Sequence, residues 1–370
     1  MKTLIFTYEI FPMPGGIQKY IHTLSKALGE IFSKENVGVV PFFGKYREAR
    51  DYKLFLQIAH FPECLKRFTH TPLLMYAIRK VKADIIIFNH ISFSKYYWFL
   101  ERWKTPYTVI VYGIEVWGEL DCREVEFLKN ARFIISISEF TKQVLVEKGI
   151  DAEKIRILYF GIDSMKFRPI PEVRTKMGID SKNILLTVCR LDASQRRKGY
   201  DKIIELLPEL KKEIPNIEYR IVGDGTDRKR IERLAKDLGV IDKISFLGSI
   251  TDENLLIEQY NICDIFIMPS EFYIGKDKVT GEGFGFVYLE AGACGKPVIA
   301  GRGGGCPESV KDGVTGFLVD PDDKKALHEA IVKVLKDKTL AEEMGRAGRK
   351  RVEQEFSYEV FVERVKKIFL

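Results

Sequence analysis

The chain has 370 residues, of which 46% are hydrophobic and 30% are charged. Its length predicts two domains of about 150–200 residues, because a single hydrophobic core rarely serves so long a chain. The net charge of +7 is too modest to indicate a nucleic-acid partner, and it is compatible with an acidic small ligand or an anionic membrane surface.

In the N-terminal half, strand and helix patterns alternate. A buried strand over residues 3–8 leads into a loop that contains Gly15 and Gly16, and a helix is predicted over 17–29. Strand, glycine loop and helix form the phosphate-facing start of a doubly wound α/β domain, although a Gly-Gly turn alone is a weak signal. Further strands are predicted over 38–42, 83–88, 107–111, 132–137 and 155–158.

Residues 43–80 fit neither pattern clearly. They interleave basic and aromatic side chains, among them Lys45, Tyr46, Arg47 and Phe68. Two interpretations stay open: a solvated helix pair with one packed face, or a patch that docks on a membrane surface or an acceptor.

Pro169 and Pro171 mark the expected domain boundary. We predict a first domain over residues 1–165, a second over 166–356, and a last helix over 357–370 that packs back on the first. In the second half, strands are expected over 183–189, 217–222, 243–247, 264–268, 297–300 and 316–319, and helices over 200–214, 253–260 and 324–335. The predicted fold class is therefore α/β, with two facing Rossmann-like domains and a cleft between them.

A glycine-rich loop, residues 280–285, precedes an apolar helix expected over 286–294, which Gly295 should end. The free amides at the start of such a helix suit an anion. Glu282 in the same loop would repel that anion, so its carboxylate suits the neutral, hydroxyl-rich part of the same ligand. The pattern indicates a nucleotide-sugar site.

Two cationic residues, Arg190 and Lys198, follow the first strand of the second half. A departing diphosphate gains charge, and each charge-assisted hydrogen bond to it contributes about 1.5–3 kcal/mol. Asp320, Asp322 and Asp323 lie in a predicted turn, and the sequence has no histidine pair at metal-ligand spacing, so we expect no metal. On these residues alone, a solvated charged turn over 196–198 is the favoured interpretation.

Signals for export or cross-linking are also missing from the sequence. The six cysteines form no Cys-x-x-Cys pair, which indicates reduced, buried thiols. The chain opens directly with a strand pattern, so no signal peptide is visible, and no apolar stretch reaches the length of a membrane span. We therefore expect a cytoplasmic protein.

Several motifs together resemble the retaining family 4 glycosyltransferases of GT-B fold. Glu282 and Glu290, with seven residues between them, are similar to the Glu-x7-Glu motif of that family. The other matches cover almost the whole chain in the family's order: Phe11-Pro-x-x-Gly-Gly-Ile-Gln18, Arg190 with Lys198-Gly199, Val222-Gly-Asp-Gly225, Phe246-Leu-Gly248 and Gly304-Gly-x-Pro-Glu308. Gly-Gly-Ile-Gln18 and Gly285-Phe-Val-Tyr-Leu-Glu-Ala291 look closest to the phosphatidylinositol mannosyltransferase group.

The resemblance implies a role for each site residue. Arg190 and Lys198 would hold the diphosphate, and Glu282 would bind the sugar hydroxyls. These three residues would be the catalytic ones. The donor-binding residues would be Gly15, Gly16, Tyr112, Phe284, Gly285 and Glu290, with no metal ligand. Tyr112 departs from the family, which often has a histidine there, and Phe160 stands where the family often has asparagine. His90 would then be either a compensating polar group or a buried structural histidine.

The function implied is a retaining, metal-independent glycosyltransferase without a cofactor. It would move a hexose, by first expectation mannose from GDP-mannose, to an acceptor hydroxyl of a lipid or a growing glycan. A GDP-sugar is favoured over a UDP-sugar. Peripheral membrane contact through residues 43–80 would place it at the inner face of the membrane. Two alternatives stay open: a GT-B nucleotide-sugar epimerase, and a non-catalytic partner that binds the donor without turning it over.

Overall fold

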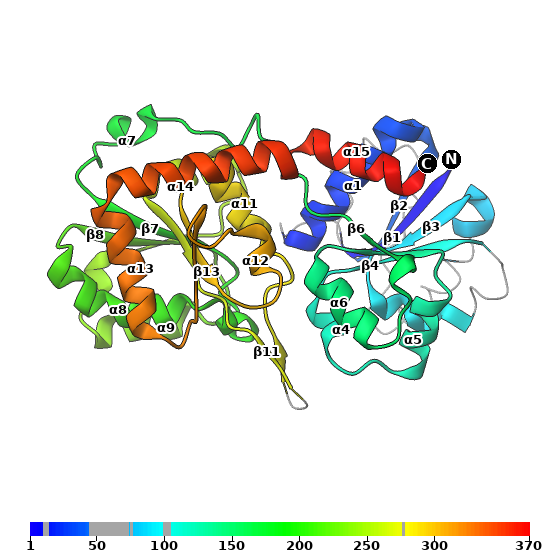
Figure 1. Ribbon diagram of the computed structural model, residues 1–370, viewed down its shortest axis with the longest axis horizontal. Helices are drawn as coiled ribbons and strands as arrows, with labels where there is room; N and C mark the ends of the chain where they lie inside the picture. The colour runs from blue at the N-terminus through cyan, green and yellow to red at the C-terminus, as the bar shows by residue number, and fades with distance from the viewer. Residues whose placement is uncertain (10–14, 44–73, 75–76, 99–104, 276–277) are drawn as a thin grey trace. The chain divides into compact units, whose positions relative to one another are not determined.

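The computed structural model describes residues 1–9, 15–43, 74, 77–98, 105–275 and 278–370 (Figure 1). Most of the basic and aromatic stretch over 43–80 lies outside these residues. The chain forms two compact units: unit 1 contains residues 1–161 and 359–370, and unit 2 contains residues 162–358.

Unit 1 is built on a parallel six-stranded sheet with the order β2-β1-β3-β4-β5-β6. Its strands are β1 (Thr3–Glu9), β2 (Val37–Phe43), β3 (Ile85–Phe88), β4 (Tyr107–Val111), β5 (Phe133–Ser136) and β6 (Ile155–Ile157). Its longer helices are α1 (Gly16–Phe32), α5 (Cys122–Lys129), α6 (Glu139–Glu147) and α15 (Tyr358–Phe369), with a short α4 (Ile114–Trp117). The four-residue strands are fully buried, as parallel strands covered on both faces should be.

Aromatic side chains fill much of the core of unit 1. Tyr20 of α1 donates a hydrogen bond to the carbonyl of Leu158 (2.9 Å), and its ring meets Phe160 edge-on at 4.9 Å. Phe361 of α15 lies 6.0 Å from the same ring. A side chain at Gly161 would collide with Phe361, so this glycine lets α15 pack closely against the sheet unit.

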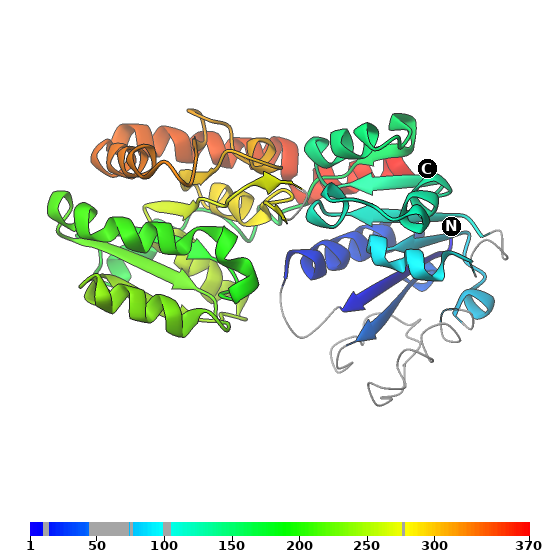
Figure 2. The same cartoon turned by 90° about the horizontal axis from the view of Figure 1, so that it is seen from below.

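Unit 2, which runs from green to orange-red in Figure 2, has a second parallel six-stranded sheet, with the order β14-β13-β10-β7-β8-β9. Its strands are β7 (Asn183–Val188), β8 (Ile217–Val222), β9 (Ile244–Gly248), β10 (Ile265–Met268), β13 (Val298–Gly301) and β14 (Gly316–Val319). Its helices are α7 (Glu172–Lys176), α8 (Tyr200–Glu213), α9 (Arg228–Asp237), α10 (Glu253–Ile262), α11 (Phe286–Ala293), α12 (Cys306–Ser309), α13 (Lys324–Lys336) and α14 (Lys338–Arg351).

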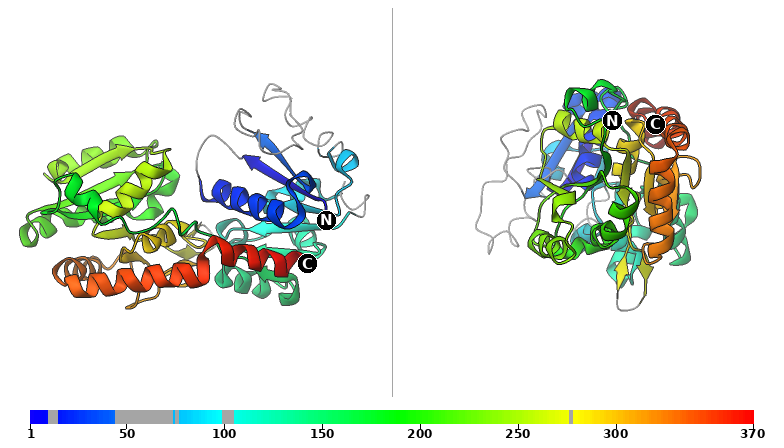
Figure 3. Two further views of the ribbon diagram at one scale, coloured as in Figure 1. Left: turned by 90° about the horizontal axis from the view of Figure 1, so that it is seen from above. Right: turned by 90° about the vertical axis from the view of Figure 1, so that its left-hand side faces the viewer.

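Helices cover both faces of the sheet of unit 2. The main apolar cluster joins the sheet to α8, α9 and α13 through side chains such as Ile203, Ile231 and Ile331. On the other face, Phe266 of β10 packs between Tyr260 of α10 (5.6 Å) and Tyr288 of α11 (5.9 Å). The long orange helix α14 runs beside α11 (Figure 3).

The structure confirms the alternating pattern and corrects the prediction in three places. Helix α11 and the positive φ of Gly295 (72°) agree with the predicted helix and its end. The hairpin of β11 (Tyr273–Ile274) and β12 (Val279–Thr280) and the long helix α14 had no predicted counterpart. The prediction of buried cysteines is wrong for Cys122, which is exposed because it opens the surface helix α5. In the described part of the chain, no helix combines the length and apolarity that a membrane span needs.

Candidate functional site

The predicted cations and Glu282 lie in segments that follow two neighbouring strands of unit 2: the loop after β7, and the segment between β10 and α11, which also contains the β11–β12 hairpin. β7 and β10 pair directly, with Leu185 opposite Ile265 and Leu186 opposite Phe266. The chain turns from β7 to β8 on one side, and β10 lies on the other. The carboxyl ends of β7 and β10 therefore flank a topological switch point, where open α/β sheets bind ligands.

The loop after β7, residues 189–199, is called the β7 loop below. It ends in a short 3₁₀ helix (Ala193–Lys198) and Gly199, which has φ of 75°. A side chain at Gly199 would collide with the carbonyl of Pro269, just after β10. The Glu271 amide donates to the carbonyl of Arg197 (2.7 Å). The glycine thus allows the β7 loop to rest on the segment that follows β10.

The second loop ends at the amino terminus of α11. Gly285 takes a left-handed conformation (φ 82°) before the helix, and no side chain caps the helix start. A side chain there would collide with the ring of Tyr288. The Gly305 amide donates to the carbonyl of Glu282 (2.8 Å), which fixes the loop against the turn before α12. The first-turn amides of α11 have the geometry that suits an anion.

Lys198 and Glu282 form an ion pair with each other. Their side chains are only 14% and 15% exposed, so water screens the pair weakly. Burial works to raise the pKa of the Glu282 carboxyl, but the charges of Lys198 and Arg197 outweigh it and lower the pKa overall. The carboxylate is therefore ionised at neutral pH.

The other cations of the β7 loop differ in environment. Arg190 is exposed and makes no ion pair with any described residue. Arg197 is partly buried, and its Nη1 has no hydrogen-bond partner within the described part of the protein. A buried donor without a partner is costly unless something else binds it. The predicted Arg190 is thus free to meet a ligand, and Arg197 is a site cation whose role the sequence did not indicate.

Glu290 lies in the interior and not on a solvated helix face. It is 2% exposed, and its Oε2 accepts a hydrogen bond from the hydroxyl of Tyr260 (2.7 Å). Burial, followed by the Glu290 charge, raises the pKa of Tyr260 far above its ordinary value, so the phenol stays a donor. The predicted burial of Glu290 is confirmed, whereas its tyrosine partner was not predicted.

Unit 1 holds the remaining predicted site residues. Gly15 precedes α1 with extended backbone (φ −94°), and no side chain caps this helix, so its first amides also suit an anion. Tyr112 is buried, and its hydroxyl donates to Oδ1 of Asn89. His90 accepts from the Ser92 amide (3.1 Å) and so caps the following 3₁₀ helix, which favours the structural interpretation of this histidine.

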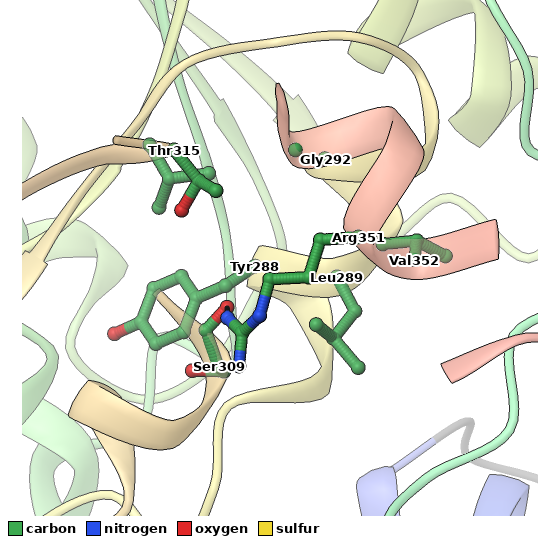
Figure 4. A pocket seen from close by; sticks show the side chains of 9 residues that line it. Tyr288, Leu289, Gly292, Ser309, Thr315, Arg351 and Val352 are labelled. Carbon is green, nitrogen blue, oxygen red and sulfur yellow. Dashed lines mark hydrogen bonds between the residues drawn. The ribbon is translucent and has the colours of Figure 1, made fainter. Parts of the chain in front are cut away.

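The side of α11 that faces α14 is closed. The cavity there has room for about 10 Å³ of water, at most about one molecule. Figure 4 shows Arg351 beside it, with its guanidinium near Ser309; Arg351 donates to the carbonyls of Ser309 (3.0 Å) and Glu308 (2.6 Å). A nucleotide or sugar does not fit there. Among the described residues, no group of three or more His, Cys, Asp and Glu side chains could hold a metal ion.

The structure therefore brings Lys198 and Glu282 into contact, and it places the loop residues Phe284 and Gly285 directly at the start of α11. Phe284 is buried, 5.7 Å from Phe356, which leaves its backbone rather than its ring for a ligand. Tyr260 and Arg197 were missed. Arg197 was detectable only as one of three adjacent cations.

Two family models together cover most of the chain. "Glycosyltransferase Family 4" matches residues 14–166 and "Glycosyl transferases group 1" matches residues 169–351. Among solved structures, a sucrose-phosphate synthase from Thermosynechococcus elongatus has a TM-score of 0.82 at 22% identity, over 100% of this chain and 98% of that one. The Anabaena protein HepE, in complex with UDP, has a TM-score of 0.80 at 20% identity over 100% and 99%. These likenesses show the fold.

Relatives with named activities are more similar in sequence. A GDP-mannose-dependent alpha-(1-6)-phosphatidylinositol monomannoside mannosyltransferase of Mycolicibacterium smegmatis is 36% identical over 60% of this chain, but the match spans only 57% of that relative. A GDP-mannose-dependent monoacylated alpha-(1-6)-phosphatidylinositol monomannoside mannosyltransferase of Corynebacterium glutamicum is 30% identical over 99% of this chain and 97% of its own length. The chain belongs to the family 4 glycosyltransferases of GT-B fold, near their phosphatidylinositol mannosyltransferases.

Proposed function

We propose that this protein transfers mannose from GDP-mannose to a hydroxyl of a lipid-linked acceptor, with retention of configuration and without a metal ion. The observation that carries the proposal is the contact of Lys198 with Glu282 beside the start of α11. This contact brings cations, free amides and a carboxylate together at the switch point between β7 and β10. The full-length relative from Corynebacterium glutamicum, by its name, supports mannose, GDP and a phosphatidylinositol-based acceptor.

In this proposal the donor exchanges the partners within the site. Lys198 leaves Glu282 for the diphosphate, and Arg190 and the first amides of α11 bind it too. Glu282 then accepts hydrogen bonds from hydroxyls of the mannose. Each charge-assisted hydrogen bond gained in this way offsets about 1.5–3 kcal/mol of the broken ion pair and of the lost hydration. Glu290 takes the ribose hydroxyls.

The proposed reaction proceeds on one face of the sugar. The bond from the anomeric carbon to the β-phosphate oxygen breaks, and the acceptor oxygen forms its bond on the same side. The released phosphate oxygen takes the acceptor proton, so GDP leaves and the configuration is kept. Arg190, Lys198 and the α11 amides stabilise the charge that grows on the diphosphate, which is the work that a metal ion would otherwise do.

Unit 1 and the acceptor complete the proposal. The amides of Gly15 and Gly16 at the start of α1 are proposed donor contacts, and so is Tyr112, whose hydroxyl would exchange Asn89 for the sugar. We further propose that the protein works at the inner face of a membrane, because a lipid-linked acceptor presents its hydroxyls there. A growing glycan is the alternative acceptor.

Product analysis with GDP-mannose and phosphatidylinositol mannoside vesicles tests this function. We expect α-linked product by NMR, in the presence of EDTA, and we expect Arg190→Ala to lose most of the transfer. Lys350→Ala removes an exposed cation of α14 and is the matched control. Product of inverted configuration, or activity that needs added Mg²⁺, would refute the mechanism; equal activity of Arg190→Ala would refute the role of this arginine.

The same assay separates the two alternative functions. An epimerase would convert GDP-mannose to another GDP-sugar without any acceptor, whereas a transferase does not convert the donor into a different GDP-sugar. A non-catalytic partner would bind GDP-mannose with neither transfer nor hydrolysis. If Tyr112 is the cause of such inactivity, Tyr112→His should restore turnover.

A further inference from the structure

Asp227 lies outside the β7 loop and holds the loop through hydrogen bonds along its length. The backbone amide of Asp227 donates to the carbonyl of Leu191 at the start of the loop (2.7 Å). The Asp227 side chain accepts from Nε of Arg196 in the middle (2.9 Å) and from the hydroxyl of Tyr200 just after the end (2.9 Å). Asp227 is 1% exposed, so its carboxylate is shielded from water.

The turn before Asp227 also docks on the loop. The Leu191 amide donates to the carbonyl of Asp224 (3.0 Å), and the Ala193 amide donates to the hydroxyl of Thr226 (3.1 Å). A side chain at Gly225 would collide with Leu191. The Gly-Asp-Gly turn that follows β8 therefore packs against the first half of the β7 loop and supports it.

Helix capping does not account for the Asp227 side chain. Aspartate before a helix usually bonds a backbone amide of the first turn. Here Asp227 precedes α9 with helical backbone (φ −90°, ψ −9°), and its side chain makes no cap bond. The carboxylate bonds Arg230 of α9 instead (Nη2 to Oδ2, 2.6 Å), together with Arg196 and Tyr200. It joins the β7 loop to α9 and to the start of α8.

We infer that Asp227 is a positioning residue for the donor diphosphate. It holds the β7 loop in one conformation, so that Arg190 and Lys198, at the two ends of the loop, are in place before the donor arrives. A preorganised loop avoids the entropy loss of ordering on binding. This inference rests on the proposed function, because it needs the β7 loop to bind the diphosphate.

Arg196→Gln tests the inference with little risk to the fold, because the Arg196 side chain is 51% exposed. Asp227→Asn is the second variant, and Lys229→Gln is the control, since Lys229 is an exposed neighbour with the same charge change. GDP and guanosine are titrated by calorimetry in EDTA, and the melting temperature is recorded for every variant. Donor KM and kcat follow from the transfer assay.

We expect wild type and Lys229→Gln to bind GDP alike, and Arg196→Gln and Asp227→Asn to bind it about 5- to 30-fold more weakly through the lost preorganisation. Guanosine, which lacks the diphosphate, should bind all four proteins equally, and donor KM should rise more than kcat falls. Arg196→Lys should restore part of the affinity. A general loosening of unit 2 would instead lower the affinities for guanosine and for GDP by the same factor.

Two outcomes overturn different claims. If folded Arg196→Gln binds GDP as wild type does, the positioning role of Asp227 is refuted while the proposed function stands. If wild type does not bind GDP, the proposed function fails and the inference fails with it. Should Asp227→Asn not fold, Arg196→Gln alone decides.

Discussion

Two carboxylates eight residues apart, Glu282 and Glu290, occupy opposite kinds of environment in unit 2. Glu282 lies in the loop before α11 and pairs with the cation of Lys198. Glu290 lies within the helix, almost fully buried, and accepts from the uncharged hydroxyl of Tyr260. In the proposed function, the donor diphosphate takes Lys198 from Glu282. Glu290 has a partner that stays with it.

This difference matches the two tasks proposed for the two glutamates. A carboxylate in a charge pair can exchange its partner when an anion binds the cation, so Glu282 can respond to the donor. A carboxylate fixed by a buried phenol keeps one oxygen oriented at little entropic cost, so Glu290 can present a constant acceptor. Substitutions of the two glutamates should therefore have different effects on the rate of transfer and on nucleotide affinity.

The largest effect is expected for Glu282→Gln. The variant loses a charge-assisted hydrogen bond to the sugar, which contributes about 1.5–3 kcal/mol, so transfer should fall about 10- to 150-fold. GDP has no sugar, and Lys198 no longer has a competing carboxylate, so GDP affinity should stay equal or rise. Initial rates and calorimetry measure the two quantities, with exposed Glu343→Gln as control. Parallel loss of transfer and GDP affinity would contradict the division of tasks.

Glu290→Gln should act on nucleotide affinity itself. The amide has one neutral acceptor oxygen where the carboxylate has two charged ones, so the proposed ribose contact weakens, and GDP and GDP-mannose should both bind about 10-fold more weakly, which corresponds to about 1.4 kcal/mol. Calorimetry with both ligands checks this. Loss of GDP-mannose binding alone would show that Glu290 contacts the sugar and not the ribose.

Tyr260→Phe sharpens the comparison with a smaller change. The missing hydroxyl should cost about 0.5–1.5 kcal/mol of the free energy of unfolding and raise donor KM a few-fold, because Glu290 loses its fixed orientation. Tyr219→Phe is the matched control, since the Tyr219 hydroxyl donates to Thr187 in the core (2.8 Å). It should lose similar stability with unchanged KM. Equal KM for the two variants would leave Tyr260 a purely structural residue.

The smallest effect concerns acid stability. The pKa of Glu282 is lowered in the folded protein despite burial, through Lys198 and Arg197. Its contribution to the free energy of unfolding should be full above the unfolded pKa, about 4.3, and should vanish as pH falls through the lowered folded pKa. Chemical denaturation from pH 7 to pH 3 compares wild type with Glu282→Gln. A difference that grows toward pH 3 would mean that the pair destabilises the fold.

The sequence predicted what local chemistry determines. Apolar spacing and Gly295 located α11, and Lys198 and Glu282, predicted as members of one site, lie in contact. Helix α14 escaped prediction because Gly345 and Gly348 resemble helix breakers, whereas they permit close packing: a side chain at Gly345 would collide with the carbonyl of Gly295. Glycine costs helix stability locally, and tertiary contact offsets that cost.

The site residues that escaped prediction depend on contacts between distant segments. Tyr260 and Glu290 are 30 residues apart, and Arg196 and Asp227 are 31 apart. No periodicity or motif records such pairs, because they form only when the sheet order brings α10 to α11 and the β7 loop to α9. Tyr260 looked like any apolar helix position.

Calorimetric titration of GDP in EDTA, with wild type, Arg190→Ala and Lys350→Ala, tests the central claim most directly. The claim is that cations and helix amides hold the diphosphate without a metal ion. It predicts that wild type and Lys350→Ala bind GDP equally and that Arg190→Ala binds about 10-fold or more weakly, as a lost charge-assisted hydrogen bond requires. Equal binding by Arg190→Ala, or wild-type binding that appears only when Mg²⁺ is added, would contradict it.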